Sequence, residues 1–205
     1  MNLSKQIMKI LTKKTALQFL SSPDSFALGQ YQRIQLDAAK ILADFQGHLN
    51  LSGLTDLSSE SATALGKHGN GYRLILDGLR QLSEPAAKKL AQHLGPITLD
   101  GLTTLSAGAA MAFSNRSTCC LDTLYNSLSI GGPKRLSIRA IKFLAEQTGP
   151  LHLDGLTQLS RSAAKALSQH KGHRLSLAGL TELSVPVAKE LATYQGHQGQ
   201  SIIRL

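Results

Sequence analysis

The segment Leu151–Gly172, LHLDGLTQLSRSAAKALSQHKG, contains the pattern from which we predict the fold of the whole chain. In LHL the two leucines point to one face of an extended backbone, and the histidine points to the other. Gly155 then follows, which is consistent with a tight turn in which φ is positive. Ser160 precedes an alanine-rich run with apolar residues at helical spacing, so the segment predicts a strand, a turn and a short helix.

The same pattern recurs along most of the chain as LxLxGLxxLSxxAAxxLAxxxG. The earliest copy is degenerate, with Phe26–Leu28 as its expected strand and Gln30 in place of the turn glycine. The positions equivalent to Gly155 are Gln30, Gly53, Gly78, Gly101, Gly132, Gly155 and Gly179, at steps of 23, 25, 23, 31, 23 and 24 residues. Seven strand–turn–helix units are therefore predicted, with the extra residues of one insertion in the longest step.

Capping residues mark both ends of the predicted helices. Pro85 and Pro186 fall in the first helical turn, where a missing N–H is tolerated. Helix N-caps are predicted at Ser58, Ser83, Ser106, Ser137, Ser160 and Ser184. Helix C-caps are predicted at Gly47, Gly95, Gly149 and Gly172.

Units of this size cannot fold alone, because a three-turn helix and a three-residue strand are each too short to be stable in water. Stability must therefore come from contact between successive units. We expect an α/β solenoid with a short parallel sheet on one side and helices on the other. Residues 25–205 form this array, with an insertion at about 115–127, and residues 1–24 form an N-terminal capping helical segment.

The pattern resembles that of the leucine-rich repeat family, in a bacterial-type variant with an alanine-rich helix, and the resemblance covers about Phe26–Gly196. It implies a curved solenoid whose strands line a concave binding face. One departure concerns the asparagine of the family motif LxxLxLxxNxL, which is replaced here throughout. The residues at that position are Leu54, Leu79, Leu102, Pro133, Leu156 and Leu180, so the buried asparagine ladder is missing and the family's turn geometry and curvature do not carry over.

The outward positions of the strands are the candidate partner-binding residues that the resemblance implies. They are Asn50, Arg73, Ile75, Asp77, Thr98, Asp100, Ser129, His152, Asp154, Arg174 and Ser176. Asp77, Asp100 and Asp154 form a row with two interpretations. They either present an acidic strip to a partner or bond to the amides of adjacent turns.

The insertion offers a second set of candidates, because loops on a rigid scaffold often carry function. Its candidate residues are Arg116, Cys119, Cys120 and Tyr125. The alternative is that the insertion is a tolerated surface excursion.

The two ends of the chain also carry predictions. Leu3, Ile7, Ile10 and Leu11 share one helical face, either of a capping helix or of a basic amphipathic helix for an anionic surface. At the other end, SIIRL at 201–205 is expected to form a last strand, whose open edge could pair with a second copy. The chain is thus expected to be a monomer or a weak homodimer.

No sequence motif for catalysis or for a cofactor is recognised, so we expect a non-enzymatic protein without a cofactor or a bound metal. The histidines near helix-closing glycines (His48, His68, His170, His173 and His197) are expected to contact backbone carbonyls. A metal site at His170 and His173 is disfavoured, because no carboxylate or cysteine completes a ligand set.

Charge gives the alternatives for the partner. The formal net charge is +9, yet the predicted concave positions sum to about −1, so the positive charge lies in the N-terminal segment and on the helices. A local cluster consists of Lys134, Arg135, Arg139 and Lys142. We therefore expect a scaffold for a protein partner, with binding of nucleic acid or an anionic membrane through the helices, or a self-associating structural module, as alternatives.

The compartment is inferred from weaker signals. The two cysteines are adjacent, which supplies no disulfide framework and suits a reducing environment. Lysines interrupt the apolar residues of the first fourteen positions, so no signal peptide is recognised. We expect a cytoplasmic protein, with secretion as an effector without a cleavable signal as the alternative.

Overall fold

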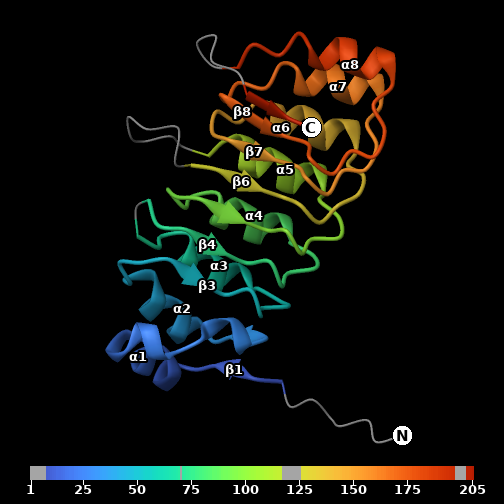
Figure 1. Cartoon of the computed structure of the whole chain (residues 1–205). Coiled ribbons are helices and arrows are strands. Elements are labelled where there is room, and N and C mark those ends of the chain that lie inside the picture. Colours follow the sequence, from blue (N-terminus) through green and yellow to red (C-terminus); the bar gives the residue numbers. More distant parts are fainter. Residues whose placement is uncertain (1–7, 70, 117–125, 197–201) are drawn as a thin grey trace, which may run out of the picture.

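The computed structural model describes residues 8–69, 71–116, 126–196 and 202–205. Within these ranges short parallel strands alternate with helices along the chain, and strands and helices stack on separate sides (Figure 1). The fold class is therefore α/β, as predicted.

One parallel sheet of seven strands contains most of the strands, in the order of the sequence. Its members are β3 (Leu49–Asn50), β4 (Leu74–Ile75), β5 (Ile97–Thr98), β6 (Leu128–Ser129), β7 (Leu151–His152), β8 (Arg174–Ser176) and β9 (Ile202–Arg204). Equivalent residues pair between neighbours, as in Leu49 with Leu74 and Leu74 with Ile97. The predicted last strand is confirmed by β9, which pairs with β8.

A helix follows each strand from β3 to β8. These helices are α3 (Ser59–Leu65), α4 (Glu84–Leu90), α5 (Ala107–Ser114), α6 (Ile138–Ala145), α7 (Arg161–Leu167) and α8 (Val185–Leu191). Each begins directly after a predicted N-cap serine, and in α3 to α7 the serine hydroxyl accepts a hydrogen bond from the backbone N–H three residues later. Ser184 is also an N-cap, although its side chain accepts no such bond.

The core lies between the sheet and the helices. Strand leucines such as Leu49 and Leu74 and helix alanines such as Ala62 and Ala87 are 0% exposed. Alanine on the inner helix face brings each helix close to its neighbour, so that contact between units buries the apolar surface that a single unit cannot bury.

The N-terminal segment differs from the prediction. Ile10 and Leu11 form strand β1 (Ile10–Leu11), not a helical face, and β1 pairs in parallel with β2 (Arg33–Ile34). Thr12 then caps helix α1 (Lys13–Ser21), as a serine caps the later helices. The segment therefore contains the second half of a further unit, while Leu3 and Ile7 lie outside the described residues.

The first predicted strand is also wrong. Phe26–Leu28 is not a strand, because one 3-10 turn (η1, Pro23–Ser25) precedes it and another (η2, Leu28–Gln30) begins at its last residue. Phe26 and Ala27 do have extended backbone angles, but they belong to neither sheet. Helix α2 (Leu36–Ala43) nevertheless follows at the expected place.

The glycines have a different role from the one predicted. Among the glycines that the structure describes, only Gly71 and Gly196 have positive φ. The turn glycines therefore do not adopt the left-handed backbone conformation that would require glycine. A Cβ at Gly78 would lie 2.3 Å from the Ser52 carbonyl oxygen, and one at Gly101 would lie 1.6 Å from that of Asp77. The backbone of the preceding unit approaches too closely for any side chain.

Three of the four predicted C-cap glycines, Gly95, Gly149 and Gly172, are explained in the same way, whereas a Cβ at Gly47 would meet the Phe45 ring. Helix α4 ends at Leu90 and helix α7 at Leu167, several residues before Gly95 and Gly172. A Cβ at Gly95 would lie 2.3 Å from the Tyr72 carbonyl oxygen, and one at Gly149 would lie 2.3 Å from that of Asn126. These glycines, like the turn glycines, allow close stacking instead of closing a helix.

No helix among the described residues is long and apolar enough to cross a bilayer.

We predict that Gly101→Ala lowers the free energy of unfolding by about 3 kcal/mol, because its Cβ would meet backbone atoms that cannot move without separating two units. The matched control is Gly29→Ala, whose Cβ would meet the movable Ser52 hydroxyl at 3.0 Å. Urea unfolding followed by circular dichroism measures both. Equal losses in the two variants would contradict the close-approach explanation.

Candidate binding face of the sheet

The outward residues of the strands form a row across the sheet. The parallel register places Asn50 beside Ile75, Ile75 beside Thr98, Thr98 beside Ser129 and Ser129 beside His152. All five are exposed or half-buried. The strands are only two or three residues long, so each contributes one residue to this row and its flanking residues to the two margins.

Ser176 does not belong to the accessible row, contrary to the prediction. Its side chain is 2% exposed, and its hydroxyl donates a hydrogen bond of 2.5 Å to Oδ1 of Asp154. Arg204 of β9 is its partner in the sheet, so Ser176 has a neighbouring strand on each side.

The aspartate row bonds to the next unit. Oδ1 of Asp77 accepts a hydrogen bond of 3.0 Å from the backbone N–H of Asp100, and Oδ1 of Asp100 accepts one of 2.7 Å from that of Gly131. Oδ1 of Asp154 accepts one of 3.0 Å from the N–H of Ala178. These bonds support the interpretation in which the carboxylates satisfy turn amides.

Hydroxyl groups strengthen this row. Ser129 donates a hydrogen bond of 2.7 Å to the same Oδ1 of Asp100 that accepts from Gly131. Each bond runs between units, and a charged acceptor makes it stronger than a neutral one. The row therefore stabilises the stack on the sheet side, while Asp100 and Asp154 remain exposed.

We predict that Asp100→Ala lowers the free energy of unfolding by about 1–2 kcal/mol, because two bonds between units are lost and the Gly131 N–H loses its acceptor. Asp100→Asn keeps an acceptor oxygen and is expected to lose less. Asp56→Ala, which removes an exposed aspartate from the loop before α3, is the control and should leave the urea midpoint almost unchanged. A loss as large in Asp56→Ala would remove the support for the row.

His152 lies among charges of both signs. Burial lowers the pKa of its imidazole, Asp154 and Asp100 raise it, and Arg174 and Arg204 lower it. Arg73 and Arg174 are exposed at the margin where the strands begin, whereas the aspartates lie at the margin where they end. The face is therefore bipolar, with a basic and an acidic margin on either side of a nearly neutral row.

Arg116 is not an exposed loop residue, contrary to the prediction. It is 6% exposed, and its guanidinium donates to the carbonyl oxygens of His93, Gly95 and Ser127 and to Oδ1 of Asn126. Burial lowers the pKa of Arg116 to about 9, so the group is still a cation at neutral pH. It joins both ends of the insertion to the preceding unit. The other candidates of the insertion, Cys119, Cys120 and Tyr125, lie outside the described residues.

Arg116 belongs to a row of buried side chains that sequence analysis missed. Its members lie ten residues after the N-caps of α2 to α8 and are the half-buried Phe45 and the buried His68, His93, Arg116, Gln147, His170 and Tyr194. We refer to this set as the inner row. The fixed distance from the caps is a signal in the sequence that could have revealed it, but the varied residue types concealed the equivalence.

Most polar members of the inner row bond to a carbonyl of the preceding unit. The Nε2 atom of His68 lies 2.9 Å from the Gly47 oxygen, and that of His93 lies 2.9 Å from the Tyr72 oxygen. The Tyr194 hydroxyl donates a bond of 2.6 Å to the Gly172 oxygen. The carbonyl contacts predicted for histidines are thus confirmed at His68, and His93, which the prediction left out, makes the same contact.

Histidine burial makes the inner row sensitive to pH. Burial lowers the pKa of His93 to about 4, with a further contribution from Arg116. Burial likewise lowers the pKa of His170 to about 4. Both residues are 3% exposed or less.

We predict that the contribution of His93 and His170 to the free energy of unfolding is fully present above pH 6.5 and is lost as the pH decreases toward 4. Between these values the two histidines bind protons in the unfolded chain and not in the folded chain. The shifts correspond to roughly 3 kcal/mol for each histidine. His93→Gln should reduce this pH dependence, and Gln147 shows that the inner row accepts glutamine. Urea midpoints measured at several pH values test the prediction, which fails if the variant and the wild type lose stability equally.

Among the described residues no group of three or more histidine, cysteine, aspartate or glutamate side chains is arranged to hold a metal ion. No protein-family model matches the chain, and no curated protein matches it significantly.

Proposed function

We propose that the protein is a leucine-rich-repeat-like solenoid that binds a protein partner through the outward face of its sheet. The observation that carries the proposal is the row Asn50, Ile75, Thr98, Ser129 and His152, with one residue from each successive strand. These side chains lie outside the core, on a backbone held in register by its neighbours. A rigid row of varied side chains suits the recognition of a specific surface.

The charge of the face favours a protein over a nucleic acid. Arg73 and Arg174 lie at one margin, and Asp77, Asp100 and Asp154 lie at the other. A phosphate backbone requires a continuous basic surface and would be repelled by the aspartate margin. A protein surface can complement both signs.

A binding role also fits the chemistry of the polar groups better than catalysis. The hydroxyls of Ser129 and Ser176 donate to Asp100 and Asp154, which leaves them structural instead of activated. His152 stands between them in the sheet, where its ring is available to a partner.

The residues at the centre of the row suggest a sharp experiment. Thr98 and Ser129 are small, half-buried neighbours on β5 and β6, so arginine at both positions would project above the face. We predict that Thr98→Arg/Ser129→Arg loses the partner captured by wild type from a native lysate treated with nuclease. The matched control is Thr104→Arg/Ser162→Arg, which adds the same charge at exposed positions away from the sheet.

A partner lost only in the sheet variant supports the proposal and identifies the target. The proposal is overturned if the sheet variant still captures the partner, or if nuclease abolishes capture by wild type and both variants. Either result would assign binding to another surface.

A further inference from the structure

A groove lies between the units of α6 and α7, beside the loops that lead into these two helices. Its volume is about 380 Å³. It is lined by Arg135, Leu136, Ile141, Leu156, Gln158, Leu159, Ser160 and Ala163. Four of these residues are large and aliphatic, and Arg135 is the one charged residue among them.

The groove coincides with a local departure from the pattern. Ile141 occupies the helix position four residues after the cap, where the other described helices have alanine, at Ala16, Ala39, Ala62, Ala87, Ala110, Ala164 and Ala188. The larger side chain packs into the core, where it is 2% exposed, and lines the floor of the groove. Leu136 and Leu159 are half-buried, as is the equivalent Leu82, while Leu183 is 44% exposed and Leu57 and Leu105 are 8% exposed. Apolar surface therefore reaches solvent at this place.

Cations surround the groove on the side of α6. Lys134, Arg135 and Arg139 are exposed, and the Arg135 guanidinium donates a hydrogen bond of 3.0 Å to Oε1 of Gln158 across the opening. The Arg139 guanidinium carbon lies 5.9 Å from the centre of the Phe143 ring. Arg135 is thus held across the opening, whereas Arg139 lies along α6 over Phe143, outside the lining.

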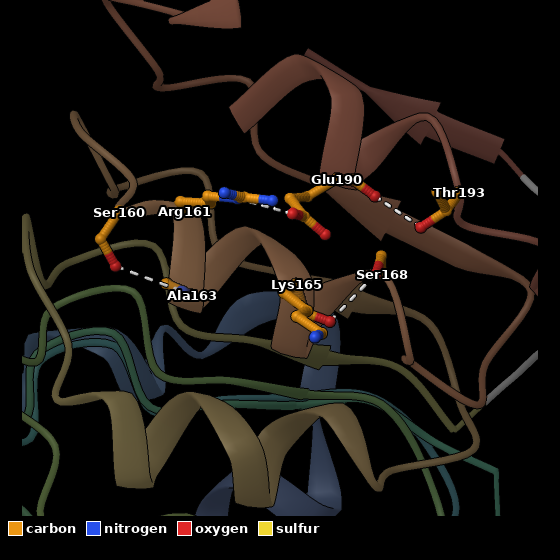
Figure 2. Close-up of polar contacts among 7 residues, drawn as sticks. All are labelled: Ser160, Arg161, Ala163, Lys165, Ser168, Glu190 and Thr193. Atoms are coloured by element: carbon orange, nitrogen blue, oxygen red, sulfur yellow. Dashed lines mark hydrogen bonds and ion pairs between the residues drawn. The ribbon is translucent and has the colours of Figure 1, made fainter. Parts of the chain in front are cut away.

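Outside the sheet, the acidic residues in the units of α6, α7 and α8 are Glu146, Glu182 and Glu190, and two of them form ion pairs. Figure 2 shows Arg161 extended from the start of α7 toward Glu190 of α8, and the two groups form an ion pair of 2.8 Å. Glu146 forms an ion pair with Lys171. Glu182 lies one unit further along the stack, at the position equivalent to Gln158. The segment 133–145 contains four cations, Lys134, Arg135, Arg139 and Lys142, and no carboxylate side chain.

We propose that this groove docks an acidic protein segment that inserts an apolar side chain. Leu136 and Leu159, which are half-buried, would cover the inserted group above the buried Ile141, and Lys134, Arg135 and Arg139 would meet carboxylates on either side of it. Apolar anchors with charged flanks are a common basis of peptide recognition. The lining offers no aromatic ring on which a base could stack, and its apolar atoms are recessed, whereas a bilayer requires protruding ones.

This surface is separate from the face of the sheet, so either proposal can fail without the other. The groove consists of residues at the turns and helix starts, and the row from Asn50 to His152 contributes none of them. The experiment uses the full chain throughout.

The test begins with selection of a random peptide library against the full chain. We expect enrichment of peptides that combine glutamate or aspartate with leucine, isoleucine or phenylalanine. Enriched peptides are then synthesised with a fluorophore, and their affinities are measured by anisotropy. Arg135→Glu/Arg139→Glu should weaken binding at least about tenfold, because the variant repels the carboxylates. Arg80→Glu/Lys88→Glu, with the same charge change on a distant turn and helix, should bind as wild type does.

A second variant tests the groove without changing its charge. Gln158→Trp places a large ring at the exposed rim and should also weaken binding, while circular dichroism reports whether the fold is intact. The proposal is overturned if no acidic peptide is enriched, or if the enriched peptides bind Arg135→Glu/Arg139→Glu as tightly as the control. It is equally overturned if Thr98→Arg/Ser129→Arg is the one variant that weakens binding of these peptides, because that result would assign their site to the sheet.

Discussion

The structure depends on the close approach of each unit's backbone to the backbone of the unit before it. The strands are two or three residues long, so the hydrogen bonds that hold them exist only between units. The turn at Gly101 is so close to the carbonyl of Asp77 that a Cβ has no room. Helix alanines permit the same spacing on the other side of the core. Stability is consequently a property of neighbouring pairs of units, not of single elements.

Two rows of polar side chains, one on the sheet side and one in the interior, form hydrogen bonds between neighbouring units and so stabilise this close approach. On the sheet side, Asp100 accepts from the Gly131 amide and the Ser129 hydroxyl of the next strand unit. In the interior, His93 and Tyr194 bond to carbonyls of the preceding units. Both rows satisfy backbone groups that the turns leave without a partner in their own unit, which is the physical reason for polar side chains at such positions.

These rows change how the candidate surfaces are understood. The aspartates accept hydrogen bonds from backbone amides of the next unit. The neutral row and the arginine margin are therefore the parts of the face with the most side-chain groups left to contact a partner. Arg116 is likewise an internal clamp that joins both ends of the insertion to one unit. The groove lies where α6 has Ile141 in place of the alanine of the other described helices, so a change in the core and a feature of the surface coincide.

The sequence by itself determined the alternation of strands and helices, the helix starts and the parallel order, because leucine spacing and capping serines are local signals repeated in every unit. It could not determine the half unit at Ile10–Ser21 or the loss of the strand at Phe26–Leu28, since these depend on which neighbour is available to pair. The tertiary structure alone decided that the glycines serve close approach instead of positive φ, that Ser176 and Arg116 are buried, and that a groove opens beside Ile141. Each of these outcomes is set by the distance between two units, and that distance is not encoded in the pattern of any one of them.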